Sequence, residues 1–430
     1  MIDVLILGGG AAGLFCAAQL GRMAPELQTV VVERRERPAR KLLITGKGRC
    51  NLCNDCEPAV LLHNVPHGAR FLFSAANAFT AKDTMRFFEG CGVPLKVERG
   101  NRVFPVSDKA RDIVDALMNA VRQAGVRVAH ATASGLLIEE GRACGVRLEG
   151  GGELRARSVV VATGGASYPA TGSAGDGYRF AAEAGHRVAA PQPALIDLLT
   201  EEGFVSELAG LPLRNVTLSL FDRKKPKKPV YRELGELLFT HRGVSGPLVL
   251  TASSLLDAGR AGDYFLSIDL KPALDPSALE RRVLRDFSER LNRDFANALD
   301  GLLPRTLIPI VIRLSGIAPH KKVNAVAKEE RAALCRLLKD FRLHIRAAGP
   351  LEEAIVTRGG VCTAEVDPRT LRSKKTEDLY FIGEVLDVDG LTGGFNLQIA
   401  FSTAFLAAKA LSTALSAKQT EELERGKTGL

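Results

Sequence analysis

A glycine-rich turn near the start of the chain constrains the fold more than any other segment. The apolar run Val4 to Leu7 predicts a buried strand, and Leu14 to Met23 predicts a helix. Between them lies the pattern Gly-x-Gly-x-x-Gly, formed by Gly8, Gly9, Gly10, Ala11, Ala12 and Gly13. In this context the first glycine permits the turn, the second admits a pyrophosphate, and the third lets helix and strand pack closely. The segment therefore predicts a dinucleotide site that includes Gly8, Gly10, Ala11, Ala12 and Gly13.

An acidic residue follows where such a unit contacts the adenosine ribose. Glu33 lies 20 residues after Gly13, at the end of the next predicted strand, Thr29 to Glu33. A carboxylate there accepts hydrogen bonds from ribose hydroxyls and repels a 2′-phosphate. We therefore place Glu33 and its neighbour Arg34 among the cofactor contacts. These features do not distinguish FAD from NAD.

Two later segments supply the other half of a dinucleotide site. Ser158 to Ala162 predicts a buried strand that leads into the small residues Thr163, Gly164 and Gly165. Leu379 to Ile382 predicts another strand, followed by an acidic loop and a glycine turn into an apolar helix, Gln398 to Leu411. The start of such a helix can stabilise negative charge on a reduced flavin. The candidate contacts are Ala162, Thr163, Gly164, Gly383, Glu384, Asp387, Gly394, Asn396 and Leu397.

These segments, with several others, resemble one family of bacterial flavoproteins. The further matching segments are Lys41 to Asn51, Ser167 to Pro169, Gly172 to Gly177, Phe239 to His241, Ser245 to Pro247 and Gly359 to Val361. The family is the HI-type or YhiN-like family, grouped with BaiN-like NAD(P)/FAD-dependent oxidoreductases. The resemblance implies an α/β fold in which a glutathione-reductase-type FAD domain is split by an insert with a β-barrel part and a helical part. It also implies reduction of an organic substrate, since BaiN-like members are associated with reducing carbon–carbon double bonds of bile-acid intermediates with a nicotinamide donor.

A polar, glycine-punctuated loop follows the second predicted strand. Its cationic and amide side chains can contact FAD phosphate or the flavin ring, and the candidate contacts are Lys41, Gly48, Arg49, Cys50 and Asn51. Cys50, Cys53 and Cys56 have Cys-x-x-Cys-x-x-Cys spacing, which fits three thiolate ligands of an iron–sulfur cluster or a functional dithiol. We favour ordinary thiols and predict no metal, because no fourth cysteine follows nearby.

Three residues are candidates for catalysis. His241 and Arg242 lie in a Gly/Ser/Pro-rich loop, where either can polarise a carbonyl that is conjugated to the reducible bond. The alternative for this pair is a domain-boundary turn. Tyr168 follows a glycine turn and is a candidate proton donor, or it simply packs.

Changes in residue composition and pattern along the chain predict where the insert lies. After Gly185 prolines and alternating strands prevail to about residue 270, and charged helical stretches follow. We predict an FAD domain in two parts, 1–190 and 356–430, and an insert over 191–355 that is β-rich at 191–270 and helical at 271–345. The 430 residues include eight cysteines and no run that we expect to span a membrane. We therefore expect a cytoplasmic protein.

The predicted reaction has two halves: NAD(P)H reduces the flavin, and the flavin then delivers hydride to an activated C=C bond of a small organic substrate. Steroids and bile-acid-like compounds are examples of such a substrate. No second strand-coupled glycine motif marks a nicotinamide domain, so a small protein or a quinone is an alternative electron donor. Two other classes remain open, an RNA-modifying flavoprotein and a flavin-based redox sensor. The basic run from Arg223 to Lys228 fits an exposed hairpin tip, so we do not expect a nucleic-acid partner. The sequence predicts no oligomeric state.

Overall fold

The computed structural model describes residues 2–427, which form two compact units. The first unit combines the chain up to Ala194 with the chain from Leu351 onward, and the second is Leu195–Pro350. Each unit has its own hydrophobic core. The predicted architecture, a first domain split by an insert, is confirmed.

The first unit is built on a seven-stranded sheet, and its parallel strands run in the order β6-β2-β1-β9 with β18 also paired to β9. These strands are β1 (Ile2–Leu7), β2 (Thr29–Glu33), β6 (Arg127–His130), β9 (Glu153–Val161) and β18 (Leu379–Phe381). Each central strand is a nearly continuous apolar run, as expected for strands that are covered on both faces. Because they are parallel, their carboxyl ends meet at one edge, where the predicted cofactor residues follow.

An antiparallel meander extends this sheet beyond β9. Its strands are β7 (Ala133–Glu139) and β8 (Arg142–Leu148), and β8 pairs with the first residues of β9. A separate three-stranded sheet contains β3 (Cys53–Asn54), β5 (Arg102–Pro105) and β4 (Leu95–Glu98). The chain leaves the first unit through β10 (Val188–Ala194) and returns through β17 (Val356–Val361), and these two strands pair with each other.

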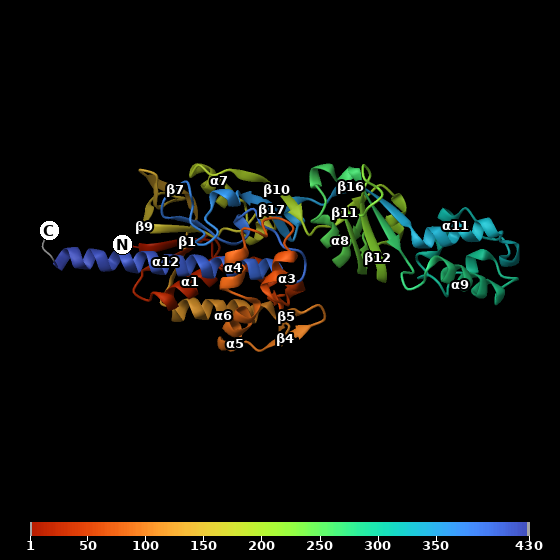
Figure 1. Cartoon of the computed structure of the whole chain (residues 1–430), viewed down its shortest axis with the longest axis horizontal. Coiled ribbons are helices and arrows are strands. Elements are labelled where there is room, and N and C mark those ends of the chain that lie inside the picture. The colour runs from red at the N-terminus through yellow and green to blue at the C-terminus, as the bar shows by residue number, and fades with distance from the viewer. Residues whose placement is uncertain (1, 428–430) are drawn as a thin grey trace. The chain divides into compact units, whose positions relative to one another are not determined.

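Helices on the sheet of the first unit include α1 and α12, which lie side by side (Figure 1). The helices of this unit are α1 (Ala11–Met23), α2 (Arg40–Ile44), α3 (Pro58–His63), α4 (Phe73–Ala78), α5 (Ala81–Gly90), α6 (Ala110–Gln123), α7 (Asp176–Glu183) and α12 (Phe395–Lys427). Phe15 of α1 is fully buried and its ring contacts the rings of Phe79, Phe87 and Phe401. This aromatic cluster fixes α1, and therefore the glycine turn before it, against the long C-terminal helix.

Helix α12 is longer than the sequence predicted. Over Phe395–Ala417 it is long and apolar enough to cross a membrane, which the sequence analysis did not anticipate. Most residues of its apolar window are buried inside the protein, among them Phe401, Ala404 and Leu411. A core helix of a soluble fold meets the same criteria of length and hydropathy, and the burial of α12 fits that role.

The second unit contains a closed six-stranded barrel. Its strands, in barrel order, are β11 (Leu198–Thr200), β14 (Gly243–Ser245), β13 (Tyr231–Phe239), β12 (Pro212–Asp222), β15 (Tyr264–Asp269) and β16 (Phe341–Ala348), and α8 (Pro247–Ser253) follows β14. Strands β12 and β13 form an antiparallel hairpin, and Lys224 to Lys228 lie exposed at its tip. The hairpin prediction for this basic run is confirmed.

A helical part is inserted between two strands of this barrel. It contains α9 (Pro276–Ser288), α10 (Ile308–Ser315) and α11 (Lys328–Lys339). The predicted helical range 271–345 runs too far, because β16 begins at Phe341 and pairs with both β15 and β11. Phe341, Leu343 and Ile345 are buried in alternation with exposed or partly exposed neighbours, which is the period of a strand.

Candidate cofactor site

A different structural feature explains the presence of glycine at each of the three motif positions of the first turn. Gly8 has φ +106°, and a Cβ there would lie 2.6 Å from the carbonyl oxygen of Ala162. A Cβ on Gly13 would lie 1.9 Å from the carbonyl oxygen of Gly8, so only glycine lets α1 start so close to β1. A Cβ on Gly10 would have no protein atom within 4 Å. The protein itself does not require glycine at position 10, whereas a ligand lying against it would.

The start of α1 is prepared for an anion. Gly10 is the N-cap residue, no side chain caps the helix, and its first turn contains no acidic residue. The amides of the first turn, including those of Ala11 and Ala12, carry the positive end of the helix dipole. A pyrophosphate over Gly10 would supply the missing acceptors.

Glu33 ends β2 beside this turn. Its carboxylate accepts hydrogen bonds from the backbone N–H of Gly9 at 2.7 Å and of Arg35 at 2.8 Å. The carboxylate is therefore held in place at the edge of the sheet, where the ribose contact is predicted. Arg34 instead forms an ion pair with Asp176 at the start of α7.

The chain after β9 approaches the same edge. Ala162 donates its N–H to the carbonyl of Leu7, which places Thr163 and Gly164 beside the glycine turn. The hydroxyl oxygen of Thr163 is buried and has no hydrogen-bond partner among the described residues. A buried hydroxyl without a partner indicates a ligand or a bound water at that position.

A lysine and a glutamate join three distant segments of the site. The Nζ atom of Lys41 lies 2.7 Å from the hydroxyl oxygen of Ser167 and 2.8 Å from a carboxylate oxygen of Glu384. The same carboxylate accepts the N–H of Thr357 at 2.9 Å and lies close to Gly164 and Gly165. Both side chains of the ion pair are partly buried, with 22% of each exposed. The folded chain thus brings together Lys41, Gly164 and Glu384, which the sequence placed in one site.

The segment that contains Glu384 also contacts the first turn of α1. A Cβ on Gly383, whose φ is +72°, would lie 2.8 Å from the Cβ of Ala12. Burial, together with the nearby carboxylate of Asp389, raises the pKa of Asp387 above its usual range. A carboxyl group in such a place can exchange hydrogen bonds with the hydroxyls of a ribityl chain.

The loop from Thr45 to Asn51 has an unusual backbone. Lys47 and Cys50 have φ of 59°, and Gly46 and Gly48 also have positive φ. Non-glycine residues in this region store strain that surrounding contacts must hold. Arg49 supplies such contacts, since it pairs with Glu98 and Asp108 and lies over the ring of Phe104. The guanidinium of Arg49 therefore anchors the loop to neighbouring strands, whereas the sequence analysis assigned it to the cofactor.

This loop meets the start of α12. With its amide oriented to satisfy both neighbours, Asn51 donates to the carbonyl of Cys53 and accepts the N–H of Gly394 at 3.1 Å. A Cβ on Gly394 would lie 2.4 Å from the carbonyl oxygen of Cys53. Asn396 bonds through both of its amide atoms to the backbone of Gly390, and Leu397 is partly buried in the same turn. The predicted flavin contacts at 48–51 and 394–397 are therefore neighbours.

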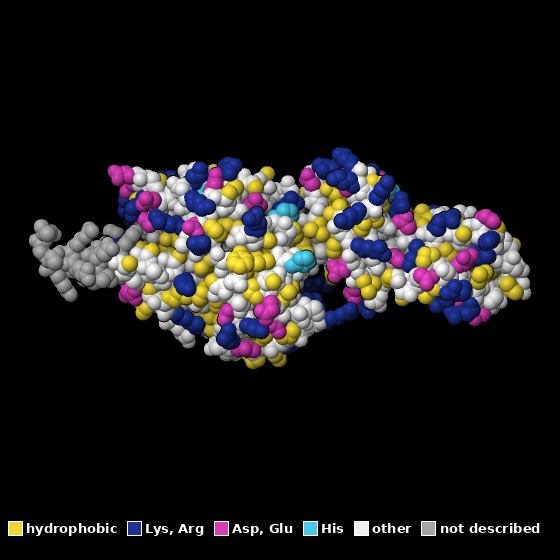
Figure 2. Space-filling view, in the orientation of Figure 1, with side chains coloured by type: hydrophobic (Ala, Val, Ile, Leu, Met, Phe, Trp, Pro, Cys, Tyr) yellow, Lys and Arg dark blue, Asp and Glu magenta, His cyan; other side chains and the backbone are white. Residues whose placement is uncertain are grey.

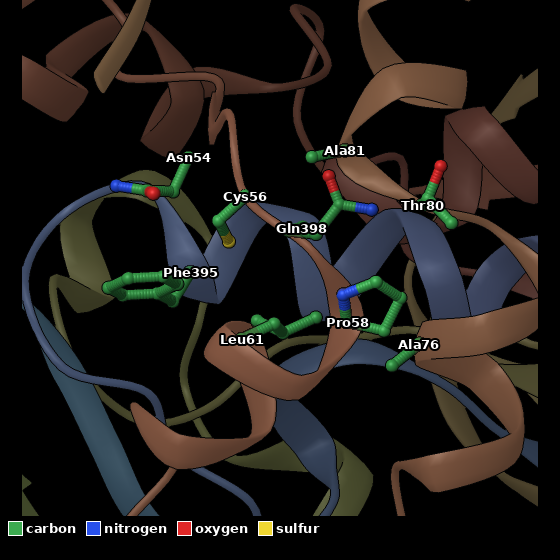
Figure 3. Close-up of a pocket in the computed structure, with 9 residues that line it drawn as sticks. All are labelled: Asn54, Cys56, Pro58, Leu61, Ala76, Thr80, Ala81, Phe395 and Gln398. Atoms are coloured by element: carbon green, nitrogen blue, oxygen red, sulfur yellow. The ribbon is translucent and has the colours of Figure 1, made fainter. Parts of the chain in front are cut away.

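A small cavity lies beside this helix start (Figure 3). Its lining includes Asn54, Cys56, Phe395 and Gln398, and its volume is about 10 Å³. This volume suffices for one water molecule at most. The cavity is therefore a packing feature next to the proposed flavin position and not the flavin pocket itself.

The thiols of the Cys-x-x-Cys-x-x-Cys segment are held in the neutral form. Burial raises the pKa of the Cys50 thiol to about 12 and raises that of Cys53 further. Burial and the charge of Asp55 also raise the pKa of Cys56. Among the described residues no group of three or more His, Cys, Asp and Glu side chains has the arrangement of a metal site.

The three residues proposed for catalysis lie in different units. His241 and Arg242 are exposed in the turn between β13 and β14 of the barrel. Tyr168 belongs to the first unit, has φ of 51°, and donates its backbone N–H to the carbonyl of Glu352. Among the described residues, no hydrogen bond or ion pair links the side chain of Tyr168 to Lys41 or Glu384.

The structure adds a pair that sequence reasoning missed. The Nδ1 atom of His67 lies 2.8 Å from a carboxylate oxygen of Asp389, whose side chain is fully buried. The two residues are separated by 322 positions and belong to no recognisable motif. The pattern Pro-His-Gly at 66–68 is typical of a turn, and it is the one local signal that could have pointed to this part of the chain.

The residues present fit FAD. The open space over Gly10, the uncapped start of α1 and the unpartnered hydroxyl of Thr163 match the needs of a pyrophosphate and its neighbours. Glu33 would hold the adenosine ribose, Glu384 or Asp387 the ribityl hydroxyls, and the start of α12 the flavin ring.

Comparison with known proteins identifies the family of the chain. The family described as "HI0933-like protein Rossmann domain" matches residues 2–410. A ribosomal RNA dihydrouridine synthase of Escherichia coli is 33% identical over 96% of this chain and 99% of its own length. A 3-dehydro-bile acid delta(4,6)-reductase of Clostridium scindens is 30% identical over 94% of this chain and 98% of its own length.

Solved structures support the fold. A 3-ketosteroid delta1-dehydrogenase from Sterolibacterium denitrificans has a TM-score of 0.51 at 14% identity, covering 96% of this chain and 99% of that chain. A quinol-fumarate reductase also has a TM-score of 0.51 at 14% identity, covering 96% of this chain and 70% of that chain. The nearly complete family match, the two full-length relatives and the geometry of the site lead to one conclusion. The chain belongs to the HI0933-like family of FAD-dependent oxidoreductases.

Proposed function

We propose that this oxidoreductase uses NAD(P)H to reduce a carbon–carbon double bond that is conjugated to a carbonyl group. One observation carries the proposal: two relatives that align with nearly the whole chain are named for different substrates but for the same bond chemistry. A dihydrouridine synthase adds hydrogen to the C=C bond of a uracil ring, and a delta(4,6)-reductase adds hydrogen to C=C bonds of a steroid. In both substrates a carbonyl activates the bond.

The residues of the first unit would bind and orient the cofactor for this reaction. When bound, FAD supplies the hydride chemistry between nicotinamide and substrate. The uncapped start of α1 would hold the pyrophosphate, and the Lys41–Glu384 pair fixes the loop that follows β18. The start of α12, near Gly394 and Asn396, would direct the positive end of its helix dipole toward the flavin and so stabilise negative charge on it.

The first candidate substrate is a uracil ring in RNA. The second unit contains 25 Lys and Arg residues against 19 Asp and Glu residues, which accounts for +6 of the total charge of +9. Figure 2 shows basic side chains over the visible surface around α9 and α11, interspersed with acidic ones. An excess of cations favours a polyanionic substrate. Charge and the 33% identical relative therefore lead us to rank RNA above the small molecule that the sequence analysis favoured.

The second candidate substrate is a small enone of the steroid or bile-acid type. The 30% identical delta(4,6)-reductase supports it, since that relative aligns over almost the same range as the RNA-modifying one. Both candidates need the same cofactor site and differ in what binds above the flavin.

An anaerobic stopped-flow experiment tests the proposal. The FAD-loaded protein is mixed first with NADH or NADPH and then with a ribosomal RNA transcript or with a 3-keto-Δ4 steroid, while flavin absorbance is followed. We expect a nicotinamide to bleach the flavin and the RNA to restore its colour, with uridine gaining two hydrogen atoms by mass spectrometry of nucleosides. A transcript without uridine is the matched control. Reoxidation by the steroid alone would favour the second candidate, and no reoxidation by either acceptor would refute the proposed function.

A further inference from the structure

We infer that His67, held by the buried carboxylate of Asp389, is the acid that gives a proton to the substrate as its double bond is reduced. This inference rests on the proposed function, because it assigns a step of that reaction. It concerns a residue pair that lies outside the glycine motif and outside the pairs already assigned to the cofactor.

The first argument is the state of Asp389. Its side chain is completely buried, and one carboxylate oxygen lies 2.8 Å from Nδ1 of His67. The other oxygen has no hydrogen-bond partner among the described residues. Burying a carboxylate in this way is costly unless a cation or a ligand compensates for it. The pair is thus more than a packing contact, because the buried carboxylate depends on the hydrogen bond with Nδ1 of His67.

The second argument is the orientation of the histidine. Because Asp389 takes Nδ1, the opposite ring nitrogen, Nε2, is left for other contacts, and 31% of the His67 side chain is exposed. A carboxylate that fixes one ring nitrogen sets the direction in which the other can give a proton. No partner for Nε2 is found among the described residues.

The third argument is the position of the pair beside the predicted flavin ring. His67 and Asp389 form an isolated β-bridge, Leu391 donates its N–H to the carbonyl of Asn64, and Gly68 packs against Val388. The segment 64–68 is therefore fastened along 387–391. This second segment continues directly into Gly393 and Gly394, which contact Asn54 and Asn51. His67 consequently lies against the loop that leads into the flavin contacts of α12.

The chemical step balances as follows. Hydride from the reduced flavin bonds to the carbon β to the carbonyl, and the π electrons of the C=C bond move to the α-carbon. The α-carbon takes the proton from Nε2 of His67, which becomes neutral. The flavin is oxidised, the substrate gains two hydrogen atoms, and NAD(P)H supplies the next pair of electrons. The exposed edge of the imidazole regains its proton from water.

A spectral titration tests the position of His67 without any substrate. A charge that appears beside an oxidised flavin shifts the visible absorption of the flavin. In the FAD-loaded protein we expect a one-proton shift of this absorption with pH that is lost in His67→Gln. It should be displaced along the pH axis in Asp389→Asn, because this substitution removes a charged group beside the histidine. The other charged groups around the histidine are Asp387 and, beside Asp387, Arg358. His63→Gln is the control, since His63 is exposed at the end of α3 nearby. Equal titrations of His67→Gln and the unmodified protein, or no titration in either, would overturn the inference.

Single-turnover kinetics test the proton transfer. Chemically reduced enzyme is mixed with the acceptor identified above, and we expect His67→Gln to lower the rate of flavin reoxidation by about 10²- to 10⁴-fold and to remove its pH dependence. Flavin binding and its reduction by NAD(P)H should not change. Unchanged reoxidation in His67→Gln would overturn the inference even if the proposed function holds. If the unmodified enzyme reduces no acceptor, the proposed function fails, while the spectral titration still decides where His67 lies.

Discussion

The Nζ atom of Lys41 lies 2.8 Å from a carboxylate oxygen of Glu384, although 343 positions of the chain separate the two residues. One residue follows the second strand of the dinucleotide unit, and the other follows the last strand of the same sheet. The inserted unit lies between them in sequence. This ion pair therefore joins the two parts of the split domain at the cofactor edge of the sheet.

We expect Lys41→Met to destabilise the FAD-free protein and to weaken FAD binding. The substitution leaves the partly buried carboxylate of Glu384 without its cation, although Thr357 still donates to it. Loss of one partner of such a pair costs about 1–3 kcal/mol when solvent still reaches it. Urea unfolding of the FAD-free protein measures the stability, and flavin fluorescence during dilution measures the binding.

Lys82→Met is the matched control for this substitution. Lys82 pairs with Glu57 at 3.2 Å, but both side chains are largely exposed. Such pairs contribute about 0–1 kcal/mol. Equal losses in the two variants would mean that the Lys41–Glu384 pair is an ordinary surface contact.

The glycine turn offers a prediction that separates folding from ligand binding. A Cβ at position 13 would overlap the carbonyl oxygen of Gly8 at 1.9 Å, so Gly13→Ala should cost about 1–3 kcal/mol of stability through a forced backbone shift. A Cβ at position 10 meets no protein atom, so Gly10→Ala should leave the stability of the FAD-free protein within about 0.5 kcal/mol. It should nevertheless weaken FAD binding by about tenfold or more, because the methyl group occupies the pyrophosphate space. Thermal unfolding and FAD titration of both variants check this, and normal FAD affinity in Gly10→Ala would move the pyrophosphate away from this turn.

The dinucleotide half of the site could be predicted from sequence because its chemistry is local. Gly8 and Gly13 are required by one turn, Gly10 leaves the space beside that turn open, and Glu33 follows at a fixed distance along one unit. The barrel and the helical part were predicted through the family resemblance, but β16 was missed because the alternation of Phe341, Leu343 and Ile345 is short and directly follows a helix. The contacts of Arg49 and the pairing of His67 with Asp389 depend on which distant strands meet. Spacing along the chain contains no signal for such contacts.

The cysteine segment should be chemically silent in the folded protein. The pKa of Cys50 is raised from 9.0 to about 12 by burial, so at pH 8 its thiolate fraction is about a thousandfold below that of a free thiol. Iodoacetamide should label the partly exposed Cys144 well before Cys50 or Cys53, as mass spectrometry of peptides can follow. Since a raised pKa keeps the neutral thiol up to higher pH, labelling of Cys50 should still increase about tenfold per unit between pH 8 and pH 10. A plateau near pH 9, or rapid labelling at pH 8, would contradict this and restore the case for a reactive dithiol.

If RNA is the substrate, the tip of the β12–β13 hairpin should contribute to its binding. Arg223 and Lys224 already pair with Glu201 and Asp263, whereas Lys225, Lys227 and Lys228 are exposed and have no ion pair among the described residues. Replacing these three lysines by glutamine removes three free cations without breaking a contact, so stability should stay within about 0.5 kcal/mol. The dependence of RNA affinity on salt should become less steep by about 2 in the log–log slope, if each lysine meets one phosphate of a single strand.

Fluorescence anisotropy with the ribosomal RNA transcript at several salt concentrations measures this slope. Replacement of the same three lysines by arginine keeps the charge and should keep the slope, which separates loss of charge from a change in the shape of the hairpin. Reduction of a small steroid enone, which has no phosphates to contact, should be equal in all three proteins. An unchanged slope in the glutamine variant would mean that RNA does not contact the hairpin tip, and the charge argument for an RNA substrate would then rest on the cations of the helical part.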